Sequence, residues 1–137
     1  KDTGAPSDLL EANRLVLDQM KRRVDGEVVG SEIRGEVVVE PGARVVNSRI
    51  TGPAHVAAGA GVENAVVGPY TSIGPMCVLR GAEVDNSILL QEARLEALRC
   101  CIGDSVLGQG VRVSGSDHFT ERGRMQLVLG DFSQVSL

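Results

Sequence analysis

Residues 33–67 read IRGEVVVEPGARVVNSRITGPAHVAAGAGVENAVV, and their aliphatic residues return at a fixed interval. Ile33, Ile50 and Val67 are 17 positions apart (50 − 33 = 67 − 50 = 17), and the aliphatic steps between the first two are six, six and five residues. A segment of five or six residues forms one short strand plus a tight corner, and three such segments make one triangular coil. The sequence therefore predicts a solenoid of parallel strands in which each coil adds one strand to each of three faces.

The same interval extends over residues 28–107 and defines three rows of apolar residues. The rows are Ile33, Ile50, Val67, Val84 and Cys101; Val39, Val56, Ile73, Leu90 and Leu107; and Val28, Val45, Val62 and Leu79, which Leu95 continues one residue early. We predict that the row residues point inward and stack on their equivalents over about four to five coils. Corner residues such as Gly42 and Asn47 fit this reading because Gly and Asn tolerate a positive φ.

The composition agrees with narrow, equivalent layers and excludes several classes of function. Aromatic residues make up 2% of the chain, whereas a conventional core of this size would use several large rings. The net charge of −4 gives no electrostatic argument for nucleic acid or an anionic membrane. We find no apolar run of about 20 residues and no secretory leader, so we expect no membrane partner and a cytoplasmic location. Because the chain starts at Lys1, we expect a processed protein or a piece of a longer one.

Two segments flank the repeats, and we divide the chain into residues 1–26, 27–113 and 114–137. In the first, residues 8–24 have helical spacing, with Leu9, Ala12, Val16 and Met20 on one stripe. We expect this helix to cover the open end or one face of the first coil, with the basic residues 21–23 as its solvated end. In the last, a polar loop precedes two short alternating strands, which close the far end either within the chain or by exchange with another subunit.

Handedness does not follow from the period. Crossovers between parallel strands are right-handed in about 98% of cases. Hexapeptide repeats with aliphatic inward residues nevertheless resemble the left-handed exception, so we expect an all-β fold, a single-stranded left-handed parallel β-helix behind a short N-terminal α-helix.

Several phrases, in order, resemble the end of the catalytic domain and the C-terminal extension of long-form glucose-1-phosphate thymidylyltransferases, which are sugar nucleotidyltransferases. These are residues 1–4 (KDTG), 8–13 (DLLEAN), 47–53 (NSRITGP), 67–74 (VGPYTSIG), 86–90 (NSILL), 104–108 (DSVLG) and 129–135 (LGDFSQV). The resemblance covers nearly the whole chain. It implies that residues 1–26 are the end of a nucleotidyltransferase domain plus a linker helix. Because the flat faces of a rigid solenoid are natural interfaces, we expect the chain to assemble or regulate that enzyme as a homo-oligomer.

The same resemblance implies a magnesium-dependent transfer of a nucleotide to a sugar 1-phosphate by the parent enzyme. Asp2 matches a metal-binding Asp of the family, but one carboxylate cannot complete an octahedral magnesium site. No Gly-rich phosphate loop precedes a helix here. We therefore assign no catalytic and no cofactor-binding residue, and expect this piece alone to be inactive and without a cofactor.

A second reading is a CoA-dependent acyltransferase, because hexapeptide β-helices also serve that chemistry. Such enzymes use a His as general base, and the candidates are His55, which we expect to point outward before inward Val56, and His118 beside Asp117. Cys100 and Cys101 are adjacent and show no zinc spacing, so we expect reduced thiols. For Tyr70 we leave open an interface role or simple packing.

Overall fold

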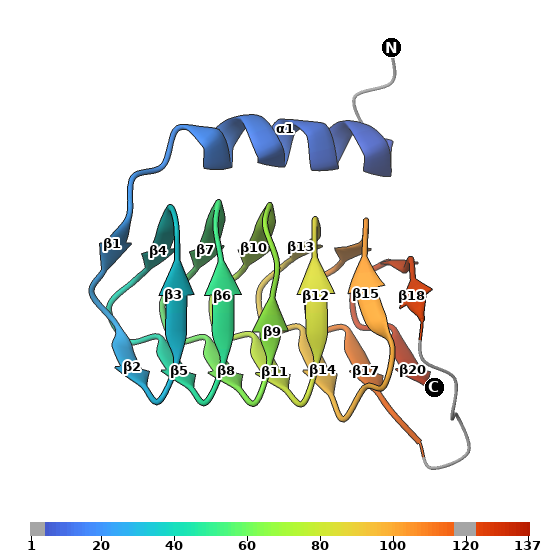
Figure 1. Ribbon diagram of the computed structural model, residues 1–137. Helices are drawn as coiled ribbons and strands as arrows, with labels where there is room; N and C mark the ends of the chain where they lie inside the picture. Colours follow the sequence, from blue (N-terminus) through green and yellow to red (C-terminus); the bar gives the residue numbers. More distant parts are fainter. Residues whose placement is uncertain (1–4, 117–122) are drawn as a thin grey trace.

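The computed structural model describes residues 5–116 and 123–137, and this part of the chain forms three parallel sheets wound into one solenoid with one helix along its side (Figure 1). Seen from the N-terminal end, the chain turns counter-clockwise as it recedes, so the solenoid is left-handed as predicted. In the described residues, no helix is long and apolar enough to cross a membrane.

Each coil contributes one short strand to each sheet. Sheet A consists of β1 (Arg23–Val24), β4 (Val37–Val39), β7 (Ala54–Val56), β10 (Thr71–Ile73), β13 (Ile88–Leu89), β16 (Val106–Leu107) and β19 (Val128–Leu129). Sheet B consists of β2 (Glu27–Val29), β5 (Arg44–Val46), β8 (Gly61–Glu63), β11 (Val78–Arg80), β14 (Arg94–Glu96), β17 (Arg112–Ser114) and β20 (Gln134–Ser136). Sheet C consists of β3 (Glu32–Arg34), β6 (Arg49–Thr51), β9 (Val66–Val67), β12 (Glu83–Asp85), β15 (Cys101–Gly103) and β18 (Arg124–Met125).

The predicted inward rows form the core. Val45 lies in register with Val62, and Leu79 lies in register with Leu95, one coil apart in sheet B. These four side chains are almost fully buried. Side chains alternate between the two faces of a strand, so β5 and β11 bury their middle residue and leave the two on either side exposed or half-buried.

Two row positions are predicted wrongly. Leu90 is 45% exposed, and the inward place belongs to Leu89, which is 1% exposed. The physical reason is a shorter corner: the step from Val84 to Leu89 is five residues, whereas the equivalent step from Val67 to Ile73 is six (89 − 84 = 5; 73 − 67 = 6).

In the same way Ile102, and not Cys101, continues the inward row of sheet C. The step from Leu95 to Ile102 is seven residues, whereas the earlier step from Leu79 to Val84 is five (102 − 95 = 7; 84 − 79 = 5). The short and the long corner offset each other, so the 17-residue count looks intact while the register shifts in between.

The C-terminal strands also differ from the prediction of two closing strands. β18, β19 and β20 pair in parallel with β15, β16 and β17 of the same chain, and therefore extend all three sheets. In this structure they complete the solenoid of their own chain.

The N-terminal helix, α1 (Pro6–Asp18), is shorter than predicted, because the chain has already turned into β1 at Arg23. It lies lengthwise beside several coils rather than over the open end or the first coil alone (Figure 1). Its buried residues are Leu10 and Leu17, which are seven apart and so share one face. The predicted stripe is wrong, because Leu9 and Val16 are exposed.

Candidate interdomain junction

Between its two buried leucines, α1 presents polar side chains to the solenoid. The side-chain amide of Asn13 donates a hydrogen bond to the backbone oxygen of Tyr70 (3.3 Å). The hydroxyl of Ser72, which points outward from β10, donates to Oδ1 of Asn13 (2.6 Å). One amide side chain therefore fixes the middle of α1 over sheet A by a donor and an acceptor contact.

Tyr70 lies at the corner between sheets C and A, with a backbone φ of 64°. Its hydroxyl donates to Oδ1 of Asp18 at the C-terminal end of α1 (2.8 Å), and the guanidinium of Arg14 lies 3.8 Å from the ring centroid. The hydrogen bond to Asp18 raises the pKa of Tyr70 above its ordinary value, because it holds the proton on the phenol. Tyr70, whose role the sequence leaves open, is thus a contact between α1 and the solenoid.

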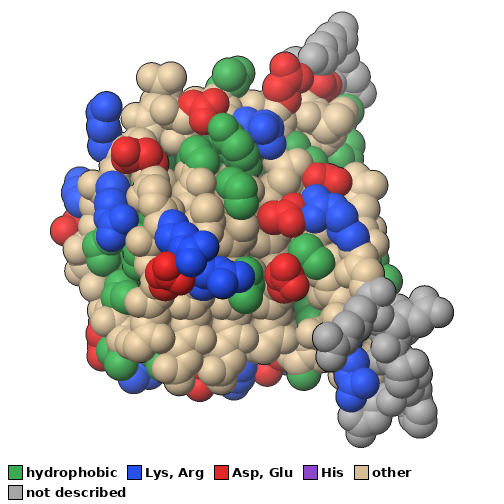
Figure 2. Space-filling view, in the orientation of Figure 1, with side chains coloured by type: hydrophobic (Ala, Val, Ile, Leu, Met, Phe, Trp, Pro, Cys, Tyr) green, Lys and Arg blue, Asp and Glu red, His purple; other side chains and the backbone are tan. Residues whose placement is uncertain are grey.

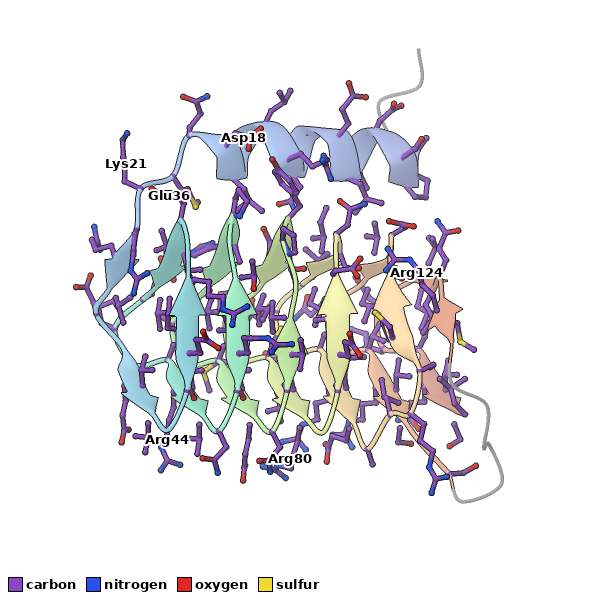
Figure 3. The ribbon with its side chains drawn as sticks, in the orientation of Figure 1. Asp18, Lys21, Glu36, Arg44, Arg80 and Arg124 are labelled. Carbon is purple, nitrogen blue, oxygen red and sulfur yellow. The ribbon has the colours of Figure 1, made fainter. Side chains whose placement is uncertain are left out.

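A chain of polar contacts continues from Arg14 along the same corner toward the last coil. Arg14 Nη1 donates to Asn86 Oδ1 (3.2 Å), and Asn86 Nδ2 donates to Asp104 Oδ1 (2.7 Å). Arg124 in β18 bonds to the same Asp104 oxygen (3.0 Å) and to the Asp85 carboxylate (2.6 Å). Figure 3 shows Arg124 on the last strand of sheet C, at the end of this series.

The charges of this series stabilise each other. The pKa of Asp104 is lowered, first by the hydrogen bond from Asn86 and then by Arg124. The pKa of Arg124 is raised, chiefly by its hydrogen bond to Asp85. We define the junction as Asn13, Arg14, Asp18, Tyr70, Ser72, Asn86, Asp104 and Arg124. Its chemistry is that of a clamp, because its side chains make hydrogen bonds and ion pairs to one another across α1 and the coils.

Arg22, which follows α1 in the chain, is hydrogen-bonded to the first coils. The backbone N–H of Arg22 donates to Oε2 of Glu36 (2.5 Å), and its guanidinium donates to the backbone oxygen of Ile33 (3.2 Å). Lys21 points away from the solenoid (Figure 3). The basic segment, expected to be a solvated helix end, therefore includes one residue that binds the first coils.

Sequence reasoning missed most of the junction. Asn86 and Asp104 have a positive φ at the corner between sheets C and A, as Asn47 and Asn64 have at the corner between sheets B and C, so an Asn or Asp at a corner was the available signal. Their pairing with Arg14 and Arg124 depends on which coils lie beneath α1. That arrangement joins residues 72 positions apart in the chain, such as Arg14 and Asn86.

The predicted site residues are not brought together in the described part of the chain. Asp2 and His118 lie outside the described residues. His55 points outward from β7, as expected, and its Nε2 lies 3.4 Å from Oε1 of Glu40. Within residues 5–116 and 123–137, no three His, Cys, Asp or Glu side chains could together hold a metal ion.

The cysteines are free thiols. Cys101, expected to point inward, is partly exposed, and its sulfur lies 3.6 Å from Oδ2 of Asp85. Burial, helped by the charge of Asp85, raises the pKa of its thiol to about 11. Burial also raises the pKa of Cys77 to about 11. Neither environment favours the thiolate, which is the reactive form.

Curated relatives match the chain over its whole length. A glucose-1-phosphate thymidylyltransferase of Streptomyces antibioticus is 42% identical over 138 residues, and one of Streptomyces griseus is 43% identical over 138 residues. Each alignment covers 100% of this chain but only 38% of the relative. The chain thus spans about two fifths of the length of these relatives.

A structural relative shares the solenoid. A variant of perosamine N-acetyltransferase from Caulobacter crescentus, in complex with CoA and GDP-perosamine, superposes with a TM-score of 0.63 at 21% identity. The match covers 90% of this chain and 62% of the other. At that identity the likeness shows the fold alone.

A family model matches more than half of the chain. The model described as "GlmU-like, C-terminal hexapeptide" matches residues 12–93, which include most of α1 and the regular coils. That is 82 of 137 residues (93 − 12 + 1 = 82). The chain belongs to the GlmU-like C-terminal hexapeptide family.

Proposed function

We propose that this chain is the C-terminal assembly and regulatory domain of a glucose-1-phosphate thymidylyltransferase. The parent enzyme transfers a nucleotide to a sugar 1-phosphate in dTDP-sugar biosynthesis, and its catalytic domain is not part of this chain. The full-length alignment with two thymidylyltransferases at 42% and 43% identity supports this parentage. We assign the magnesium to the catalytic domain and the parent enzyme to the cytoplasm, where sugar phosphates and nucleotides are made.

The observation that carries the proposal is the clamp between α1 and the coils. α1 is held along the solenoid by Asn13, Arg14 and Asp18, in addition to its two buried leucines. A helix fixed in this way transmits a fixed orientation to the polypeptide that precedes it. The solenoid can therefore hold catalytic domains in a defined relation instead of on a loose tether.

We assign the outward side of α1 to the catalytic domain. Leu9, Leu15 and Val16 are exposed there, although the opposite side of the same helix is buried on the coils. A surface helix usually has one apolar side, so a second apolar side indicates a further partner. The relatives are long enough to contain such a partner, because 62% of their length lies outside the aligned region (100 − 38 = 62).

We assign homo-oligomer formation to the outer face of sheet C, which α1 leaves free. The rigid sheet faces of a solenoid are suited to contacts between copies related by rotation. On the side of sheet C, positive and negative side chains are interspersed (Figure 2). Such a surface pairs with a copy of itself more readily than a surface of one sign.

The test uses the parent enzyme with and without the solenoid. We expect removal of residues 27–137 to lower the number of subunits in sedimentation velocity, and Leu9→Ser with Val16→Ser to lower kcat/KM for thymidylyl transfer. The matched control is Val29→Ser, an equally exposed valine on sheet B away from α1. An unchanged subunit number after truncation would contradict the assembly role. Acetyl transfer from acetyl-CoA that is abolished by His118→Ala would instead support the acyltransferase reading.

A further inference from the structure

A hollow of about 810 Å³ lies on the outer face of sheet B near its C-terminal end. It is lined by Arg94, Arg112 and Gln134 from the strands of sheet B, and by Met76, Glu92 and Phe132 from the corners that precede strands of this sheet, which we call the rim. None of these residues belongs to the junction, which lies at the corner between sheets C and A.

The arginines of this hollow are arranged differently from the others on the same face. Arg44 lies opposite Glu27 and forms an ion pair with it (3.3 Å), and Arg80 pairs with Glu63 on the preceding strand (3.3 Å). Arg94 and Arg112 instead lie directly opposite each other on β14 and β17. Like charges in such cross-strand positions, about 4.8 Å apart, destabilise a sheet.

The surrounding residues do not neutralise this pair fully. Arg94 bonds to Glu96 on its own strand (3.1 Å). Arg112 makes no ion pair with any described residue, and the next residue in register with it is the uncharged Gln134.

Glu96 also lies 3.9 Å from Arg80, on the other side of Arg94. Glu92, the other carboxylate nearby, accepts a hydrogen bond from Gln91 (3.1 Å). Two adjacent guanidiniums of which only one has a paired carboxylate favour an anion that contacts both, because arginine binds phosphate oxygens through paired N–H groups.

The rim adds an aromatic ring. Phe132 is 68% exposed and Met76 is 57% exposed, and both have a positive φ, 61° and 60°. The equivalent corners hold Gly42, Gly59 and Gly110, for which this backbone conformation is unstrained. Met76 and Phe132 adopt the same positive φ as these glycines, as other corner residues of the chain do, so the hollow has side chains where the equivalent corners have none.

The ring lies against the corner beside it. A Cβ placed on Gly110 would come within 2.5 Å of the Phe132 ring, so the ring occupies the space that a side chain at position 110 would take. Phe132 is two residues before Gln134, which lies in register with Arg112. The backbone of Phe132 is therefore about 7 Å along the strand direction from the row formed by Arg94 and Arg112. A planar base stacked on Phe132 and a diphosphate on the arginines are within the reach of one nucleotide.

We propose that this hollow binds a nucleoside diphosphate group. Arg94 and Arg112 contact the phosphates, Phe132 stacks on the base, and Glu92 is placed on the rim to accept hydrogen bonds from base or ribose. The same chemistry is present in a thymidine diphosphate sugar and in coenzyme A. The claim concerns binding and does not depend on the activity of the parent enzyme.

The test is calorimetric titration of the 137-residue chain at low salt with thymidine diphosphate, coenzyme A, pyrophosphate and thymidine. We expect saturable binding of one of the first two, at least tenfold weaker in Arg112→Gln. Phe132→Gly should weaken that nucleotide and leave pyrophosphate unchanged. Arg44→Gln, an exposed arginine on the same face outside the hollow, is the matched control and should bind like the wild type. Tighter binding of thymidine diphosphate identifies a nucleotide sugar as the source, and tighter binding of coenzyme A identifies the cofactor.

Three results would overturn the proposal. The first is the absence of saturable binding of both nucleotides. The second is an equal effect of Arg112→Gln and Arg44→Gln, which would indicate general electrostatic attraction. The third is a change in the mass of the assembly in Arg112→Gln with no nucleotide bound, which would assign the arginines to an interface between copies.

Discussion

The outer faces of sheets A and B are built on the same repeat but differ in what they present. The outward residues of β4, β7, β10, β13 and β16 in sheet A are Val38, His55, Ser72, Ile88 and Val106, all of them half-buried. The outward residues of sheet B include Arg44, Glu63, Arg80 and Arg112, all of them exposed. In Figure 3, Arg44 and Arg80 project from sheet B away from the solenoid.

The difference separates two kinds of information in the repeat. The inward residues are aliphatic on all three sheets and determine the coil. The outward residues determine what each sheet contacts: the half-buried face of sheet A is covered by α1, and the charged face of sheet B remains free for water, a ligand or another copy. The following predictions test that distinction.

The largest effect is expected where α1 meets sheet A. Leu17→Ala should lower the free energy of unfolding by about 2–4 kcal/mol, because Leu17 is 1% exposed and its removal leaves a cavity under the helix. Leu15→Ala is the matched control on the outward side, 65% exposed, and should change stability by about 0.5 kcal/mol or less. Urea denaturation and hydrogen exchange of the α1 amides measure both. Equal stability of the two variants would mean that α1 is not docked as described.

A smaller effect is expected from the polar part of the same contact. Asn13→Ala removes the bonds to Tyr70 and Ser72 and should cost about 1–2 kcal/mol, because both bonds are partly buried. Ser72→Ala removes one of them, and the double variant should cost less than the sum of the two single variants. Strict additivity in that double-mutant cycle would show that the two side chains do not interact.

Part of the fold of both sheets could be predicted from the sequence, and part could not. The three sheets and most of the inward rows could be predicted, because burial inside a narrow coil demands an aliphatic residue at each inward place. The left hand followed only from the resemblance to hexapeptide repeats. The register around Leu89 and Ile102 could not, because an apolar neighbour stands beside each of them and hides the change in corner length. A period reports the mean length of a coil, not the length of each corner.

The buried side of α1 was predicted wrongly for a different reason. Its sequence has two apolar sides, one with Leu10 and Leu17 and one with Leu9 and Val16, and helical spacing alone cannot rank them. The side with the polar Asn13 and Arg14 is the docked one, because the corner residues beneath it offer hydrogen-bond partners. Those partners come from coils far along the chain, so the junction is a property of the folded solenoid.

The pH dependence of stability tests the far end of the junction. Asp104 has a pKa below its ordinary value in the folded state, so its carboxylate stabilises the fold at all pH values above that ordinary value. This stabilisation is lost as the pH falls through the lower, folded value. The urea midpoint should therefore fall less between pH about 5 and pH about 2 in Asp104→Asn than in the wild type. Arg124→Gln should lie between the two. The same fall in all three proteins would contradict the assigned partners of Asp104.

The smallest effects are expected on sheet B. Arg44→Gln breaks an exposed ion pair with Glu27 and should lower stability by about 0.5 kcal/mol or less. Arg112→Gln removes the repulsion from Arg94 and should raise stability by a few tenths of a kcal/mol, roughly the size of one cross-strand pair. Thermal unfolding of the two variants side by side gives the signs. A loss of stability in Arg112→Gln would mean that Arg112 has a stabilising partner within the folded chain.

The most direct test of the account is the mass of the chain in solution. One copy of the 137 residues has a mass of 14.4 kDa. If the solenoid assembles its parent enzyme, sedimentation equilibrium at increasing concentration should give a whole-number multiple of that mass greater than one. A strict monomer at the highest concentration would contradict the assembly role.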